Sequence, residues 1–187
     1  IHAAGFVCRD LKPENVLLDE RGAAKLADFS VCTRLAAGER AYTLCGTAGY
    51  MSPEVAGRKG HAAPADLWSL GVLVVEMMTG RNPFEAAAAD NDAVHRDPAA
   101  ATASLPRHAR EFASSLLQVQ PDRRPTAAAC LEHPWLADVD IAAIEAGTAQ
   151  SPLRPAPRPA QRIDALAQDA GWWSACGASD VGRVEGW

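Results

Sequence analysis

The chain has 187 residues, of which 48% are hydrophobic and 22% are charged, and its formal net charge is −5. That length and composition predict one soluble globular domain with a substantial core. The mild acidity argues against nucleic acid or an anionic membrane as a partner, because the overall field would attract neither. No apolar run reaches the ~20 residues that a membrane-spanning helix needs.

Two short strands are expected near the start of the chain. One is the apolar run at residues 16–18 and the other is the segment 24–27, with a reversal at residues 20–22 between them. The stretch that follows, residues 30–55, has no clean period of 2 or 3.6. We therefore expect a long loop there, and long loops in compact domains are usually functional.

The clearest helix is predicted at residues 64–79. Pro64 lies near its start, apolar residues run nearly all round it, and Gly80 lies just past its end. A helix that is apolar on every side is expected to be buried at the centre of the fold.

Two further helices are predicted downstream. Residues 107–119 form an amphipathic pattern, with Phe112, Leu116 and Val119 on one face. Residues 126–135 predict the second, shorter helix.

In this shorter helix Thr126 is a candidate N-cap and Pro134 marks the end. From Ala146 onward we expect largely irregular chain, since "SPLRPAPRPA" predicts an extended polyproline-like run and the last residues show no periodicity.

The cysteines point to a cellular location. They are odd in number and widely spaced, at Cys8, Cys32, Cys45, Cys130 and Cys176. No two of them form a CxxC pair, which disfavours a zinc site and a disulfide framework. Thiols of this kind are typical of a reducing compartment, so we expect the cytoplasm, with the nucleus as an alternative.

The stretch "CRDLKPENVLL" holds side chains that suit phosphoryl transfer to a hydroxyl. Asp10 can accept or orient the hydroxyl proton, Lys12 can offset the charge of the phosphate, and the oxygen of Asn15 can bind a hard divalent cation. Asp28, at the end of the second predicted strand, supplies a carboxylate for the same cation. A hairpin is expected to bring Asn15 and Asp28 side by side at one edge.

Five motifs, "RDLKPEN", "DFS", "GTAGYMSPE", "DLWSLG" and "PDRRP", resemble in order and spacing the C-terminal lobe of a eukaryotic protein kinase. The resemblance implies a mainly α fold with a small β-hairpin. It also implies a serine/threonine kinase that uses ATP and Mg²⁺ on protein substrates. On this basis residues 1–136 are a partial kinase domain and residues 137–187 are a C-terminal tail, largely irregular or disordered.

The resemblance assigns roles within the catalytic stretch. Asp10 is the catalytic base, Lys12 neutralises phosphate, Asn15 and Asp28 hold the metal ions with their nucleotide, and Leu17 forms the floor under the adenine ring.

The resemblance also assigns roles around the activation loop. Thr43 is the position of an activating phosphate, which an upstream kinase would add and Arg9 would bind, although an ordinary loop threonine is the alternative. Thr47 would hydrogen-bond near the catalytic residues and mark serine/threonine specificity.

Three further residues are expected to be structural. Glu54 and Arg124 would form a buried ion pair, which is costly to break. Asp66 in the central helix would bind the backbone of the catalytic loop.

The segment "TLCGTAGYMSPEV" is most similar to the AGC group, with the cyclic-nucleotide-dependent kinases as the nearest resemblance. In that group two glutamates, here Glu14 and Glu76, bind an arginine that precedes the phosphoacceptor, so we expect substrates with basic residues upstream of Ser or Thr. The alternative is that Glu76 only ends a buried helix. The aromatic motif that usually closes the tail is not recognisable, and Trp172 and Trp173 are weak substitutes.

Several departures from the family keep a second hypothesis open. Cys8 stands where His or Tyr is usual and would pack less fully against Phe29, and Ser30 replaces a glycine that permits more backbone angles. No GxGxxG or VAIK-like run occurs, so the N-terminal lobe would precede Ile1 and this chain alone would be inactive.

The alternative function is a non-catalytic, pseudokinase-like module that docks substrates or a partner kinase. A third hypothesis is that "PLRPAPRP" is a ligand for an SH3-like domain.

Overall fold

The computed structural model describes residues 1–85 and 97–149, which belong to one compact unit, Ile1–Arg154. The predictions for Cys176, for Trp172 and Trp173 and for the proline-rich run lie outside the described residues. The α-helices are α1 (Pro53–Ala56), α2 (Pro64–Thr79), α4 (Pro98–Thr102), α5 (Arg107–Leu116), α6 (Ala127–Leu131) and α7 (Ile141–Glu145). The short 3₁₀ helices are η1 (His2–Ala4), η2 (Pro13–Asn15), η3 (Ala48–Tyr50), η5 (Pro121–Arg123) and η6 (Pro134–Leu136).

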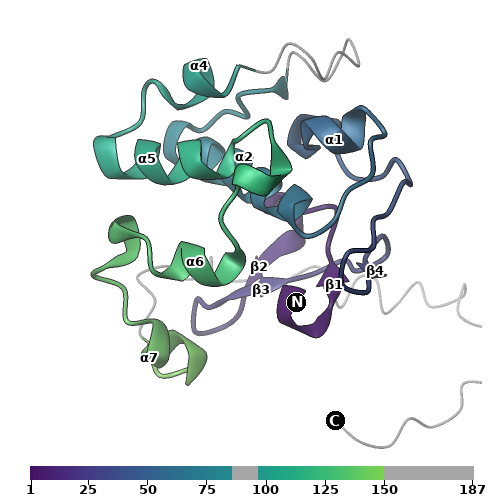
Figure 1. The fold of residues 1–187 in the computed structure, drawn as a ribbon. Coiled ribbons are helices and arrows are strands. Elements are labelled where there is room, and N and C mark those ends of the chain that lie inside the picture. The colour runs from purple at the N-terminus through teal and green to yellow at the C-terminus, as the bar shows by residue number, and fades with distance from the viewer. Residues whose placement is uncertain (86–96, 150–187) are drawn as a thin grey trace, which may run out of the picture. The chain divides into compact units, whose positions relative to one another are not determined.

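Helix α2 is the centre of the fold, as its apolar sequence predicts. Ten of its residues are buried, from Ala65 to Val75, and Trp68 is fully inaccessible. Pro64 lies in the first turn of α2, where its missing N–H costs no hydrogen bond. The helix ends at Gly80, which has the left-handed backbone conformation. Helix α5 packs alongside it (Figure 1), so the two helices supply most of the core.

Helix α5 is shorter than its sequence pattern predicts. Phe112 and Leu116 are buried as expected, but the helix ends at Leu116 and Val119 is 56% exposed, so the prediction for Val119 was wrong. The reason is a tertiary contact: the guanidinium of Arg124 donates to the carbonyl oxygens of Gln118 and Val119, at 2.8 and 3.4 Å. These bonds hold residues 118 and 119 in a non-helical conformation, where the sequence pattern predicts that the helix continues.

Helix α6 is also shorter than expected, although its cap is confirmed. The hydroxyl of Thr126 accepts the N–H of Ala129 at 3.1 Å. The helix ends at Leu131, and Pro134 begins η6, because a proline lacks the N–H that a continuing helix needs.

Helix α7 begins after Asp140, whose carboxylate accepts the N–H of Ala143 at 2.9 Å. It is an ordered element at the start of the segment that the sequence assigns to an irregular tail.

The described residues contain two small antiparallel sheets. Strands β2 (Val16–Leu18) and β3 (Ala24–Leu26) form the predicted hairpin, with Val16 opposite Leu26. The carboxylate of Asp19 fixes the turn by accepting the N–H groups of Arg21 and Ala23, at 3.0 and 2.9 Å.

The second sheet pairs β1 (Phe6–Val7) with β4 (Thr33–Arg34) and was not predicted. Strand β4, helix η3 and helix α1 all lie in the segment expected to be a loop. Two-residue strands are too short to show periodicity, so the sequence carries no local signal for them.

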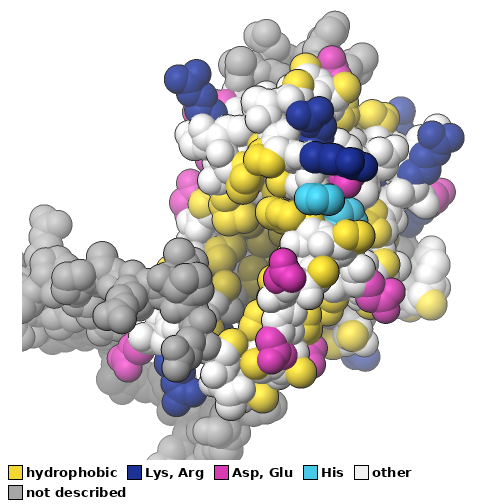
Figure 2. Space-filling view, turned by 90° about the vertical axis from the view of Figure 1, so that its left-hand side faces the viewer, with side chains coloured by type: hydrophobic (Ala, Val, Ile, Leu, Met, Phe, Trp, Pro, Cys, Tyr) yellow, Lys and Arg dark blue, Asp and Glu magenta, His cyan; other side chains and the backbone are white. Residues whose placement is uncertain are grey.

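The described part of the chain is therefore mainly helical with a small β-hairpin, which confirms the fold class. No helix among the described residues is both long and apolar enough to cross a bilayer. Large hydrophobic side chains nevertheless remain exposed, among them Leu17, Phe29 and Met77. Figure 2 shows hydrophobic side chains gathered in a hollow on one face of the molecule.

Candidate active site

The candidate site is built on the loop that follows β1. The hydroxyl of Thr47 donates to Asp10 Oδ1 at 2.8 Å, and Lys12 Nζ donates to Thr47 Oγ1 at 2.9 Å. Lys12 Nζ also lies 3.0 Å from Asp10 Oδ2. A carboxylate, a hydroxyl and an ammonium group thus form a closed triangle, which holds the carboxylate in one orientation.

Asn15 joins this group through its amide nitrogen. Pro13 begins the 3₁₀ turn η2, which brings the buried Asn15 side chain back toward Asp10. Asn15 Nδ2 donates to the carbonyl oxygen of Asp10 at 2.8 Å and to its Oδ2 at 3.2 Å. Because the amide nitrogen points toward Asp10, the amide oxygen is directed away from it.

Asp28 reaches the site through the hairpin. The N–H of Ala27 donates to the carbonyl of Asn15 at 2.8 Å, so the β2–β3 register continues to the residue before Asp28. The Asp28 carboxylate accepts the Ser30 N–H at 3.1 Å. Hydrogen bonds from the side chain and backbone of Ser30 lower the pKa of Asp28, and the charge of Lys12 lowers it further.

The structure therefore brings Asp10, Lys12, Asn15 and Thr47 into direct contact, whereas Asp28 is linked to them through backbone pairing and charge.

Asp66 of α2 fixes the stem of the catalytic loop. Its two oxygens accept the N–H groups of Cys8 and Arg9, each at 2.8 Å, as the sequence predicts. Arg9 has a φ of 69°, a left-handed angle that costs a non-glycine residue energy, and these bonds help to hold it.

Gly46 packs directly on this stem. A Cβ atom at position 46 would lie 2.4 Å from the carbonyl oxygen of Arg9, and Gly46 has a φ of 99°. Only glycine allows the two segments to come this close.

The expected ion pair between Glu54 and Arg124 is present and buried. Arg124 Nη1 lies 2.6 Å from Glu54 Oε1, and Nη2 lies 2.8 Å from Oε2. Arg124 Nη1 also donates to the carbonyl of Pro64 at 2.8 Å, and the guanidinium lies over the ring of Trp68. The pair therefore joins α1 to the start of α2 and to the chain after α5.

Tyr50 is a site residue that the sequence did not single out. Its hydroxyl donates to the carboxylate of Glu76. Burial raises the pKa of Tyr50, the bond to Glu76 raises it further, and the charges of Glu76 and Glu14 act in the same direction, against a hydrogen bond from Asn82. The charges of Glu14 and Glu76, which are far apart in sequence, both raise the pKa of this one hydroxyl. The only available signal was the position of Tyr50 within the "GTAGYMSPE" motif.

In the part of the chain that the structure describes, no hydrogen bond joins Arg9 to Thr43. Arg9 Nε donates to the carbonyl of Val31 at 2.6 Å, and Thr43 is exposed in the segment between Ala41 and Gly46. Leu17 is exposed on β2.

The departures at Cys8 and Ser30 have consequences different from those expected. Cys8 is only 3% exposed, whereas Phe29 is 54% exposed, so no buried stack forms between them. Ser30 is not among the described residues with positive φ; Asp28 carries that angle instead, at 57°. Ser30 therefore does not need a glycine-like backbone angle here, and its N–H donates to the carboxylate of Asp28.

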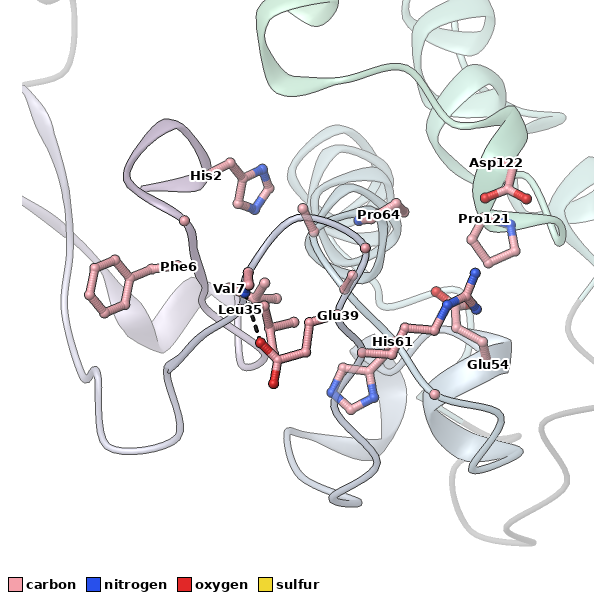
Figure 3. Close-up of a pocket in the computed structure, with 17 residues that line it drawn as sticks. His2, Phe6, Val7, Leu35, Glu39, Glu54, His61, Pro64, Pro121 and Asp122 are labelled. Carbon is pink, nitrogen blue, oxygen red and sulfur yellow. Dashed lines mark hydrogen bonds between the residues drawn. The ribbon is translucent and has the colours of Figure 1, made fainter.

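A pocket of about 290 Å³ lies elsewhere on the molecule (Figure 3). Its lining includes His2, Leu35, Glu39, His61 and Pro121, and Asp10, Lys12, Asn15 and Asp28 are not part of it. His61 is 3% exposed and its Nε2 has no hydrogen-bond partner in the described chain. Burial lowers the pKa of His61, and the charge of Arg9 adds to this effect.

The donor set suits magnesium together with phosphate. No cluster of three or more His, Cys, Asp or Glu side chains able to hold a metal occurs in residues 1–85 and 97–149. A divalent cation would rely on the amide oxygen of Asn15, the carboxylate of Asp28 and phosphate oxygens, and Mg²⁺ is usually bound by such oxygens.

Comparison with known proteins agrees with this geometry. The family model described as "Protein kinase domain" matches residues 1–136. The chain is 38% identical over 164 residues to ribosomal protein S6 kinase alpha-6 of Homo sapiens, covering 83% of this chain and 22% of that protein. It is 43% identical over 127 residues to ribosomal protein S6 kinase 2 alpha of Xenopus laevis, covering 67% and 17%.

It is also 35% identical over 162 residues to the serine/threonine-protein kinase AtPK2/AtPK19 of Arabidopsis thaliana, covering 83% of this chain and 34% of that protein. The chain thus spans 22% and 17% of the two S6 kinases and 34% of the Arabidopsis thaliana kinase. S6 kinases are AGC-group enzymes, in agreement with the resemblance of the activation segment. Because the family model covers most of the sequence, this chain belongs to the protein kinase domain family.

Proposed function

We propose that this chain carries the phosphate-transfer residues of a serine/threonine protein kinase, which moves the γ-phosphate of ATP to a Ser or Thr hydroxyl of a protein substrate. The triangle of Asp10, Thr47 and Lys12 is the observation that carries the proposal. Membership of the kinase family supports it.

Each member of the triangle has a defined task. Asp10 accepts or orients the proton of the substrate hydroxyl, and the hydrogen bond from Thr47 keeps its carboxylate aligned for that step. Lys12 lies 3.0 Å from the carboxylate, where its charge offsets that of the transferring phosphate.

Asn15 and Asp28 are proposed to hold Mg²⁺, which neutralises charge on the ATP phosphates when it is bound. The carboxylate of Asp28 is ionised at neutral pH, as a metal ligand requires, and the hydrogen bonds from Ser30 lower its pKa further. The exposed side chain of Leu17 on β2 offers an apolar surface for the adenine ring.

Glu14 and Glu76 are proposed to select substrates with a basic residue before the phosphoacceptor. Tyr50 supports this role because its hydroxyl orients the carboxylate of Glu76. Carboxylates bind a guanidinium strongly through paired, charge-assisted hydrogen bonds.

Thr43 is exposed, as a site for an upstream kinase must be, and Arg9 is the cation proposed to bind its phosphate.

The alternative is a non-catalytic module that docks substrates or a partner kinase. Cys8 fits its buried site, and the N–H of Ser30 supports the carboxylate of Asp28. Two of the three departures that keep that hypothesis open, Cys8 and Ser30, thus leave the contacts of Asp10, Lys12 and Thr47 intact.

The test uses the full-length protein that contains this chain, labelled ATP and a pair of peptides with Arg or Ala before the serine. The variant Asp10→Asn should lose at least ~100-fold in rate while its circular dichroism stays unchanged, because the general base is removed. Asp138→Asn, at an exposed aspartate outside the site, is the matched control and should retain full activity.

Equal rates for Asp10→Asn and the unaltered protein would show that Asp10 is not the base. Equal rates for the two peptides would refute the preference for an arginine before the serine but would leave the role of Asp10 untouched.

A further inference from the structure

Two cysteines flank the sheet β1–β4: Cys8 directly follows β1, and Cys32 directly precedes β4. Sheet β1–β4 pairs Phe6 with Arg34 and Val7 with Thr33, and one further step of this antiparallel register brings Cys8 opposite Cys32. Beyond the two cysteines, the side chain of Arg9 donates through Nε to the carbonyl of Val31 at 2.6 Å. The two cysteine segments are therefore held together on both sides of the pair.

The hydrogen-bond pattern identifies the type of pair. The N–H of Leu35 donates to the carbonyl of Gly5 at 2.9 Å, so these residues form a hydrogen-bonded pair of the ladder. Because bonded and non-bonded pairs alternate along antiparallel strands, extending the ladder by one pair beyond Val7 and Thr33 would place Cys8 and Cys32 at a non-bonded position. At such positions the Cα atoms are about 4.5 Å apart and the side chains approach closely. Disulfides span Cα separations of roughly 4.4–6.8 Å.

The N–H groups of both cysteines agree with this assignment, since neither donates across the ladder. The N–H of Cys8 donates to Asp66 at 2.8 Å, and the N–H of Cys32 donates to the carbonyl of Phe29 at 3.0 Å. Neither backbone bond has to break for the side chains to meet.

The surroundings of the thiols also favour this pair. Both are reduced, Cys8 is buried and Cys32 is partly exposed, so a small oxidant can reach one member. Burial raises the pKa of the Cys8 thiol, and Cys32 is among the neighbouring groups that raise it further. Burial also raises the pKa of Cys45, but its charged neighbours are Arg9 and two aspartates.

We infer that Cys8 and Cys32 form a reversible modification site, a cross-strand disulfide that ties the stem of the catalytic loop to the segment following Asp28. A peroxide is the oxidant. The thiolate of Cys32 attacks one peroxide oxygen and releases hydroxide, which gives a sulfenic acid.

The sulfur of Cys8 then attacks the sulfenic sulfur. An S–S bond forms, the S–O bond breaks, and the oxygen leaves as water with the proton of Cys8. The two sulfurs together supply the two electrons that reduce the peroxide. A dithiol reductant reverses the reaction.

The test needs no kinase activity, so its outcome is independent of the proposed function. Full-length protein is treated with hydrogen peroxide, its remaining thiols are alkylated, and a tryptic digest is analysed by mass spectrometry without reduction. Trypsin places Cys8 in the peptide that ends at Arg9, Cys32 in residues 26–34 and Cys45 in residues 41–58. We expect the first two peptides to be cross-linked and to separate with dithiothreitol. A cross-link of residues 26–34 to residues 41–58, or full alkylation of both cysteines, would overturn the inference.

A variant pair tests the order of the two steps. In Cys8→Ser the sulfenic acid on Cys32 has no resolving thiol, so labelling of Cys32 by dimedone should rise several-fold over the unaltered protein. Cys130→Ser removes a buried cysteine in α6 and should leave the labelling unchanged. Equal labelling of Cys32 in the Cys8→Ser variant and the unaltered protein would contradict Cys8 as its partner.

Discussion

At the scale of single residues, Thr47 connects the two charged groups of the candidate site. Its hydroxyl is both a donor to Asp10 and an acceptor from Lys12, so one small side chain fixes the spacing between a carboxylate and an ammonium group. The sequence indicates Thr47 through its motif, but only the structure shows both bonds at once.

The variant Thr47→Val keeps the shape of the side chain and removes both hydrogen bonds. We expect the phosphate-transfer rate to fall about 10-fold or more, because the alignment of the Asp10 carboxylate is lost. Steady-state kinetics with a peptide substrate measure the effect. Thr148→Val, at an exposed threonine outside the site, serves as the control, and a loss equal in both variants would contradict the role of Thr47.

His61 makes stability depend on pH. Burial lowers its pKa from the ordinary value of 6.5, so below about pH 6.5 the unfolded chain binds a proton that the folded chain resists. The charge of Arg9 also lowers the pKa, against Glu54 and Asp66. We therefore expect the free energy of unfolding to be highest above pH 6.5 and to fall as the pH drops through that range.

Urea unfolding at pH 5.5 and 7.5 measures this difference. The variant His61→Gln should flatten the pH dependence, whereas His108→Gln, at an exposed histidine of α5, should leave it unchanged. An equally steep dependence in His61→Gln would show that another group is responsible.

At the scale of secondary-structure elements, the contact between α2 and the end of α5 is close because Gly71 has no side chain. A Cβ atom there would lie 2.9 Å from side-chain atoms of Leu117 and 3.0 Å from Cβ of Leu116. This spacing explains how the helix that carries Asp66 packs tightly enough to hold the catalytic loop.

The variant Gly71→Ala should lower the free energy of unfolding by about 1–3 kcal/mol, because the added methyl group overpacks the interface. The loss prevails over the helix propensity of alanine, which favours the substitution by roughly 1 kcal/mol. Urea unfolding measures the change. If Leu117→Ala is added, the combined loss should be smaller than the sum of the two single losses. Exact additivity would show that the two positions do not touch.

At the scale of the whole molecule, the ion pair between Glu54 and Arg124 joins segments 70 positions apart in sequence. The same guanidinium caps the chain after α5 and binds the start of α2. One buried side chain therefore connects α1 to two helices of the core.

The variant Arg124→Leu leaves Glu54 buried without its partner, so we expect a loss of roughly 3–5 kcal/mol in the free energy of unfolding. Arg107→Leu breaks an exposed pair with Glu111, in which the side chains are 83% and 48% exposed, and should cost less than about 1 kcal/mol. Chemical denaturation of both variants gives the comparison. Similar losses for the two would contradict the structural role of Arg124.

The sequence alone was sufficient for features that rest on local pattern. Periodicity and turn chemistry predict the buried helix α2, the hairpin β2–β3 and the Thr126 cap. The spacing of the motifs was enough to predict the contacts of Asp66 and the Glu54–Arg124 pair. These features were predictable because neighbouring residues, or a whole motif set, carry the signal.

Only the tertiary structure decided the rest. The β1–β4 sheet, the end of α5 before Val119 and the bond from Tyr50 to Glu76 all depend on segments that meet after folding. The proximity of Cys8 and Cys32, 24 positions apart, is of the same kind, since the register between β1 and β4 leaves no trace in the sequence of either strand. Local sequence sets which elements form, whereas long-range packing and backbone hydrogen bonds set where each element stops and which side chains come into contact.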